Sequence, residues 1–153
     1  MRVIVAAVGR PRTAALAAAI AFYEDRAARY WPLEVREVRE EPARSAGADR
    51  VRDREGERLA AQVEGADVVV CDERGKGMTS EDFARWLQES RERARDVAFV
   101  IGGAYGVAPA VRDRASRRLA LAPWTLPHEM ARLVLAEQLY RAGTIVRGEP
   151  YHK

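Results

Sequence analysis

The sequence has few of the residues that mark secreted, metal-binding or membrane proteins. It contains one cysteine, Cys71, in 153 residues, so no disulfide can form within the chain. Cys71 ends the apolar run 68–71, where we expect a small buried side chain and no metal ligand. No run of 18 or more apolar residues is present, and the alanine-rich stretch 14–22 lacks the basic leader of a signal peptide. We therefore expect a cytoplasmic protein without a metal or a membrane span.

Lysine is also scarce, and the net charge is small. Lys76 and Lys153 are the two lysines among 26 basic residues, and 23 acidic residues leave a formal charge of +3. This total supports nucleic-acid binding only weakly, because acidic residues are interspersed with the basic ones. Position is more informative. Residues 112–118 hold four arginines and one aspartate, and further cations follow, so we expect the last third of the chain to face a polyanion.

The pattern of apolar residues predicts a single α/β domain over residues 1–153. Short apolar runs typical of buried parallel strands occupy residues 2–8, 67–71 and 97–101. The alternating run 33–38 predicts a strand near a sheet edge. Apolar residues at helical spacing occupy residues 13–30 and 80–91, and residues 48–63 are predicted to form a charged helix with few apolar positions. With loops at 40–47 and 72–79, this alternation predicts a mostly parallel sheet flanked by helices on both faces.

Two signals mark helix starts. Thr79 and Asp82 have the spacing of a capping box before the helix at 80–91. Residues 119–129 read LALAPWTLPHE and combine a short apolar strand, a proline-bracketed loop and the start of a helix that continues to residue 142. Pro127 suits the first helical position, and Thr125 can offer its hydroxyl to the open N–H groups. Such a junction turns backbone groups toward a small ligand, so we interpret it as a ligand loop.

Two glycine-containing segments are similar to nucleotide-binding loops without matching them. Residues 102–106 read GGAYG after a buried strand, but neither the spacing nor the place in the chain is that of a dinucleotide-binding motif. A tight turn that needs glycine torsions explains them equally well. Residues 74–79 lack the first glycine and the Ser or Thr of a phosphate loop. A surface loop with two cations is the simpler interpretation there.

Three segments together resemble one family: residues 97–106 (VAFVIGGAYG), the loop and helix of 119–142, and the ending 150–153 (PYHK). Matches at 8–9, 72–76 and 137–142 extend the resemblance over the whole chain. The family is ribosomal RNA large subunit methyltransferase H, a group of SPOUT-class enzymes that methylate N3 of a pseudouridine in 23S (large-subunit) ribosomal RNA. The resemblance implies a SPOUT-type α/β fold with a C-terminal trefoil knot, a homodimer, and the assembled ribosome as substrate, with neither DNA nor a membrane as partner.

The resemblance also implies S-adenosyl-L-methionine as the methyl donor. The residues that it places at this cofactor are Cys71, Asp72, Gly102, Gly103, Ala122, Pro123, Trp124, Thr125, Leu126 and Pro127. Asp72 can accept a hydrogen bond from the cofactor or serve in a turn. Trp124 can stack on the ligand, cover the core or lie at a subunit interface. Family members often carry serines where this chain has Ala120 and Ala122, so hydroxyl contacts from those positions are lost.

The family's active site implies roles for the end of the chain. The ending Tyr151-His152-Lys153 matches residue for residue, and in the family this tail helps to form the active site across the dimer. We expect His152 to accept the N3 proton, Arg141 to position the base and Tyr151 to pack on it. Arg141 or Lys153 can instead stabilise the oxyanion that develops on the base.

Two other interpretations stay open at this point. A non-enzymatic ribosome- or RNA-binding protein of the same α/β fold would have lost cofactor binding. An unrelated nucleotide-binding α/β domain would use the turn at Gly102 for phosphate and would prefer a phosphorylated nucleotide to S-adenosylmethionine.

Overall fold

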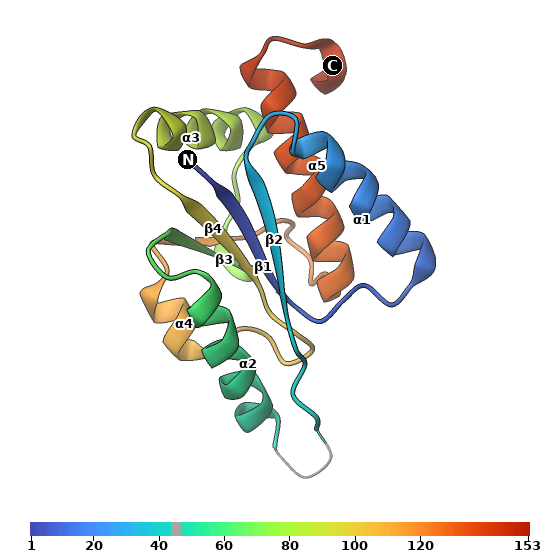
Figure 1. Ribbon diagram of the computed structural model, residues 1–153, viewed down its shortest axis with the longest axis vertical. Coiled ribbons are helices and arrows are strands. Elements are labelled where there is room, and N and C mark those ends of the chain that lie inside the picture. The colour runs from blue at the N-terminus through green and yellow to red at the C-terminus, as the bar shows by residue number, and fades with distance from the viewer. Residues whose placement is uncertain (44–46) are drawn as a thin grey trace.

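The computed structural model describes residues 1–43 and 47–153, and it is built around one parallel sheet (Figure 1). The strands are β1 (Val3–Val8), β2 (Leu33–Val38), β3 (Asp67–Lys76), β4 (Val97–Ile101) and β5 (Arg117–Leu119). They lie in the order β2-β1-β4-β3-β5, and all four pairings are parallel. The predicted mostly parallel sheet and the edge position of residues 33–38 are confirmed. The loop predicted at 40–47 includes residues 44–46, which lie outside the described part.

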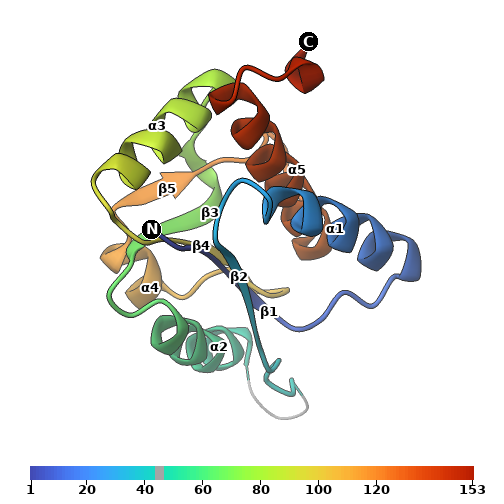
Figure 2. The ribbon, with the colours of Figure 1, turned by 45° about the horizontal axis from the view of Figure 1, so that its top comes forward.

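Helices cover both faces of this sheet (Figure 2). They are α1 (Ala14–Ala27), α2 (Ala48–Gln62), α3 (Ser80–Glu92), α4 (Pro109–Arg114), α5 (His128–Val146) and the short 3-10 helix η1 (Pro150–His152). The Thr79 hydroxyl accepts the N–H of Asp82 at 3.1 Å, which confirms the predicted cap of α3. Helix α4 was not predicted, because six residues are too few to show helical spacing. Within the described ranges, no helix is both long and apolar enough to cross a bilayer.

The position of β1 inside the sheet explains why its sequence is apolar without interruption. Successive side chains of a strand point to opposite faces, and β1 lies between two layers of helices. Val3 and Val5 pack in the core beneath α1, α3 and α5, where Leu135 of α5 is fully buried. Ile4 packs on the other side, with Leu59 of α2. Both faces of β1 are therefore covered, and no position is left for a polar side chain.

Strand β3 is longer than its apolar run indicated. The loop predicted at residues 72–79 is wrong for residues 72–76, which continue the strand to Lys76. The ladder with β5 is irregular, since Cys71 and Lys76 both pair with Leu119. Here the strand has passed beyond its ladder with β4, which ends at Val70, and its side chains are partly exposed. Charged residues are compatible with such a strand end, so composition did not reveal it.

The strand and helix boundaries around the predicted ligand loop also differ from expectation. The strand is Arg117–Leu119, upstream of the apolar residues that were expected to form it, and α5 begins at His128 and extends to Val146. Pro127 has φ −54° and ψ 148° and is therefore the N-cap rather than the first helical residue. The capping role predicted for Thr125 is wrong, because α5 has no side-chain cap and the Thr125 hydroxyl donates to Glu73 instead.

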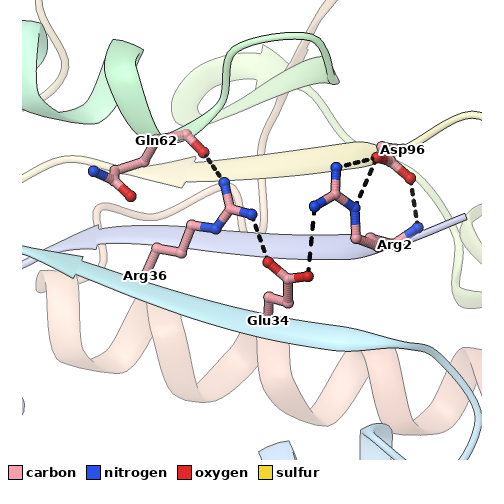
Figure 3. A network of polar contacts seen from close by, with 5 residues as sticks. All are labelled: Arg2, Glu34, Arg36, Gln62 and Asp96. Atoms are coloured by element: carbon pink, nitrogen blue, oxygen red, sulfur yellow. Dashed lines mark hydrogen bonds and ion pairs between the residues drawn. The ribbon is translucent and has the colours of Figure 1, made fainter.

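A network of polar side chains joins the amino ends of the strands (Figure 3). Asp96, just before β4, accepts from the backbone N–H and the guanidinium of Arg2, both at 2.7 Å. Glu34 of β2 joins Arg2 to Arg36, which also donates to the backbone carbonyl of Gln62. The Arg2 side chain is 51% exposed, so these pairs stabilise the fold only slightly. This edge is the one opposite to the carboxyl ends, where the candidate site lies.

Candidate cofactor and active site

A cavity of about 520 Å³ lies at the carboxyl ends of β3 and β4 and is called the edge cavity below. Its volume is in the range of small-molecule sites, about 300–1,000 Å³. Eight of the ten residues predicted to bind the cofactor line it, namely Cys71, Asp72, Gly102, Gly103, Ala122, Trp124, Thr125 and Leu126. Pro123 and Pro127 belong to the same loop but are not among the lining residues. Segments separated by up to about 50 residues in sequence thus meet where ligands bind in open α/β sheets.

The glycine turn forms one wall of the edge cavity. The carbonyl of Gly103 accepts the N–H of Gly106 at 3.0 Å, and Gly106 has a φ of +82°. A Cβ placed on Gly102 would lie 2.6 Å from the carbonyl carbon and oxygen of Gly106. The turn therefore closes only with glycine at position 102, and it presents backbone rather than side chains to a ligand.

The hydrogen bonds of Asp72 fit the turn role, one of the two roles expected for it; the other was a hydrogen bond to the cofactor. Its carboxylate accepts the backbone N–H of Arg74 at 2.9 Å and the guanidinium of Arg118 at 2.7 Å. Burial opposes ionisation of Asp72, but the Arg74 N–H and Arg118 outweigh it and hold the pKa of the carboxyl below its usual value. Asp72 is therefore ionised and in contact with two protein donors.

The loop on the opposite wall leaves Trp124 in solvent. Its side chain is 78% exposed, so the alternative in which it covers the core is wrong. Leu126 is half-buried against the core cluster under α5, and Ala122 also lines the cavity. Ala120 does not line the cavity, and its N–H donates to the carbonyl of Lys76 at 3.1 Å.

Cys71 is partly buried, at the point where β3 enters the edge cavity. Burial raises the pKa of its thiol to about 12, because the thiolate would lose its hydration. At neutral pH the side chain is a neutral, apolar part of the wall. This agrees with the small hydrophobic residue expected from the sequence, except that Cys71 contacts the cavity as well as the core.

The residues predicted to carry the chemistry form a second group around the end of α5. Arg141 and Glu137 are paired at 2.6 Å, and the Tyr151 hydroxyl donates to Glu137 at 3.2 Å. The Tyr151 ring packs on Tyr140, with 4.5 Å between the ring centroids, and the Arg141 guanidinium lies 5.0 Å from the Tyr151 ring. Burial and the nearby Glu137 raise the pKa of Tyr151, so its phenol stays neutral. His152 ends η1, and its Nδ1 is buried without a hydrogen-bond partner among the described residues.

Within one chain this tail cluster does not reach the edge cavity. The part of α5 that lines the cavity ends at Ala131, and Arg141 follows ten residues later, about 15 Å along the helix axis. Both ribbon views show the C-terminus beyond the far end of α5 (Figures 1 and 2). One chain therefore holds both groups of predicted residues but keeps them apart.

Other cavity residues were not predicted from the sequence. Arg52, Arg74, Arg112 and Tyr105 line the edge cavity. Arg112 belongs to the cationic run, Tyr105 to the glycine turn and Arg74 to the segment interpreted as a surface loop, but none of them was assigned to the cofactor. A neighbouring hollow of about 1,200 Å³ shares the wall formed by Gly103 to Tyr105, and Glu55 is buried beside it. Burial raises the pKa of Glu55, whose Oε1 has no partner in the described part of the chain. No signal in the charged helix 48–63 distinguished Arg52 or Glu55 from their neighbours.

In residues 1–43 and 47–153, no group of three or more His, Cys, Asp or Glu side chains is placed to hold a metal ion.

Comparison with known sequences finds relatives along the full chain. A family model described as "Predicted SPOUT methyltransferase" matches residues 1–152. Ribosomal RNA large subunit methyltransferase H of Gemmatimonas aurantiaca is 68% identical over 154 residues, which cover all of both chains. The proteins of the same name from Anaeromyxobacter sp. (strain Fw109-5) and Geobacter sp. (strain M21) are 50% and 43% identical, over 100% and 99% of both chains.

Solved structures show the same fold at low sequence identity. A methylase-family protein from Haemophilus influenzae superimposes with a TM-score of 0.56 at 12% identity, covering 99% of this chain and 70% of that one. The TrmH/SpoU tRNA modifying enzyme of A. aeolicus gives 0.51 at 11% identity, with 95% and 77% covered. At these identities the likeness concerns the fold alone.

Proposed function

The chain belongs to the SPOUT methyltransferase family, and from this premise we propose that it methylates N3 of a pseudouridine in large-subunit (23S) ribosomal RNA, using S-adenosylmethionine. The observation that carries the proposal is the 68% identity, over the full length of both chains, to a protein named ribosomal RNA large subunit methyltransferase H. The edge cavity supports it, because residues assigned to the cofactor by resemblance come together there from three separate segments.

The edge cavity suits the methyl donor in size and in lining. The backbone of the glycine turn would hold it from one side, and residues 121–126 from the other, with Cys71 as a neutral apolar surface. Ala122 offers no hydroxyl, so backbone groups and apolar contacts would carry the binding. When bound, S-adenosylmethionine supplies a methyl group activated by its sulfonium.

The acceptor nitrogen has to lose its proton as it bonds to the methyl carbon. We assign this proton to His152 on the family resemblance of the ending 151–153. Arg141, oriented by its 2.6 Å pair with Glu137, positions the base, and the neutral Tyr151 packs on it. The bond between sulfur and the methyl group breaks as the bond from N3 forms, so no metal or covalent enzyme intermediate is needed.

The distance between the tail cluster and the edge cavity supports a homodimer in which each active site combines the cavity of one subunit with the tail of the other. At a cofactor concentration that does not saturate Gly102→Ala, the variants His152→Ala and Gly102→Ala would each have little activity alone. Random pairing of the two would restore roughly a quarter of the wild-type activity, since half of the dimers are mixed and each mixed dimer has one intact site. If the mixture stayed as inactive as the separate variants, the composite site would be wrong.

The remaining proposals follow from the family. They are a single SPOUT domain over residues 1–153, a trefoil knot around the loop that follows β5, a cytoplasmic location and the assembled ribosome as substrate. A domain of this size offers a small surface for RNA, which suits a large folded particle better than free RNA. Neither DNA nor a membrane has a place in this function.

A labelling experiment tests the proposal. Purified protein, methyl-labelled S-adenosylmethionine and ribosomes that lack the modification would be incubated, with protein-free ribosomal RNA in parallel, and any label would be mapped. Label on a large-subunit pseudouridine in ribosomes is the expected result. Cofactor binding without label would show that the acceptor is wrong. Absence of both cofactor binding and label would favour the non-enzymatic alternative.

A further inference from the structure

The four arginines between residues 112 and 118 have different surroundings in the fold. Arg118 pairs with Asp72 at 2.7 Å, and the Arg117 guanidinium lies 5.1 Å from the ring of Trp86. Arg114 is exposed on α4 and does not line the edge cavity. Arg112, two residues earlier on the same helix, does line it. Only one of the four therefore presents an uncommitted charge to the cavity.

A second uncommitted cation lines the same cavity from a different element. Arg74 of β3 also lines the edge cavity and is exposed. The side chains of Arg74 and Arg112 make no ion pair or hydrogen bond with residues 1–43 or 47–153, whereas Arg52, the third arginine of the wall, pairs with Asp49 at 3.2 Å. Two arginines of the cavity lining therefore have no direct ion pair within the described residues.

The acidic side chains of the same wall offset only part of this charge. Asp72 is held by Arg118 and by the N–H of Arg74. Glu73 accepts from the Thr125 hydroxyl, which carries no charge, so Glu73 still offsets one of the two arginines. Arg112 is close enough to contribute to the lowered pKa of Asp72, but the direct ion pair of Asp72 is with Arg118. Because Arg118 compensates Asp72, the cavity lining keeps an excess of positive charge from Arg74 and Arg112 over Glu73.

We propose that Arg74 and Arg112 form a binding site for backbone phosphate of the RNA at the mouth of the edge cavity, beside the nucleotide that is methylated. The site rests on the proposed function and gives it a means of docking RNA against the cofactor. Guanidinium groups bind phosphate oxygens through paired N–H donors, and contacts from β3 and α4 would fix the strand from two directions. The carboxylate of the cofactor is the other anion that the two arginines could bind, and the experiment below distinguishes it from an RNA phosphate.

The experiment compares the double variant Arg74→Ala/Arg112→Ala with Arg114→Ala, which removes an equal type of charge from the same helix outside the cavity. Affinity for ribosomes lacking the modification would be measured at several salt concentrations, and affinity for S-adenosylmethionine separately. We expect the double variant to bind ribosomes about tenfold more weakly, with a salt dependence reduced by about one unit per arginine. Cofactor affinity should stay within twofold, and Arg114→Ala should match the wild type in both assays.

Several results would overturn the site. Equal losses in Arg114→Ala would show a diffuse electrostatic effect, and an unchanged salt dependence in the double variant would show that neither arginine neutralises a phosphate. Weaker cofactor binding with normal ribosome binding would assign the pair to the cofactor carboxylate. If wild-type protein neither bound nor methylated ribosomes, the proposed function would fail and the site with it. If the wild type methylates ribosomes and the double variant equals it, the phosphate site alone is wrong.

Discussion

Replacing Gly102 by alanine should disable cofactor binding while leaving the chain folded. The new Cβ would lie 2.6 Å from the carbonyl carbon and oxygen of Gly106 and 2.9 Å from Cγ2 of Val107. Ordinary contact begins at about 3.4 Å, so the turn has to open by about 0.8 Å. The atoms in the way are mostly backbone and cannot rotate aside. The displacement therefore passes directly to the wall of the edge cavity.

The size of the effect follows from this displacement. A misplacement of about 1 Å in a positioned site costs up to about 100-fold in rate, and we expect cofactor affinity to fall by about 10- to 100-fold. Overpacking of this kind costs about 1–3 kcal/mol of unfolding free energy. Because domains are stable by about 5–15 kcal/mol, most of the variant should remain folded at 25 °C.

Isothermal titration with S-adenosylmethionine and urea unfolding would measure the two effects separately. Gly77→Ala is the matched control, because a Cβ there approaches only the carbonyl oxygen of Ala120, at 4.0 Å. The control should bind the cofactor like the wild type. If Gly102→Ala bound it within twofold of the wild type, the turn would not be the close-fitting wall inferred here.

Three further predictions concern single side chains. Arg132 of α5 is 8% exposed and pairs with Glu24 at 2.8 Å and with Glu37 at 2.7 Å. Arg132→Ala should therefore lower the unfolding free energy, measured by urea titration, by about 3–5 kcal/mol. A loss below about 1 kcal/mol would contradict the pairing. Burial raises the pKa of Cys71 to about 12, so at pH 8 its thiolate fraction is much lower in the folded chain than in the unfolded one. A thiol reagent should therefore label the native protein more slowly than the urea-unfolded protein, and equal labelling rates would refute the burial of the thiol. The contribution of the neutral thiol to the unfolding free energy should be complete below pH 9 and should decline as the pH rises from 9 toward 12. Trp124→Ala should leave the melting temperature within about 2 °C of the wild type, because Trp124 is 78% exposed. A large drop in the melting temperature, measured by calorimetry, would show that Trp124 packs in the folded molecule.

The parts of the fold that could be predicted depend on short-range patterns. An unbroken apolar run as short as residues 97–101, followed at once by two glycines, favours a strand buried on both faces. Thr79 and Asp82 form a cap within four residues. The continuation of β3 beyond Cys71 and the short helix α4 were missed for the corresponding reason, since they depend on pairing with β5 and on packing against α2 rather than on their own periodicity. The residues proposed to bind the cofactor were reached through the family resemblance, because no local pattern separates Gly102 from an ordinary turn glycine.

By itself the sequence determined the order of strands and helices, their parallel arrangement and the family, because these depend on periodicity and on motifs that are continuous in the chain. Only the tertiary structure decided which charges are paired. Asp72 and Arg118 are 46 residues apart, and their contact exists because β3 and β5 are neighbours in the sheet. The same folding leaves Arg112 facing the edge cavity and carries Tyr151 to the far end of α5. Side chains that are alike in sequence thus acquire different roles from the partners that long-range packing brings to them.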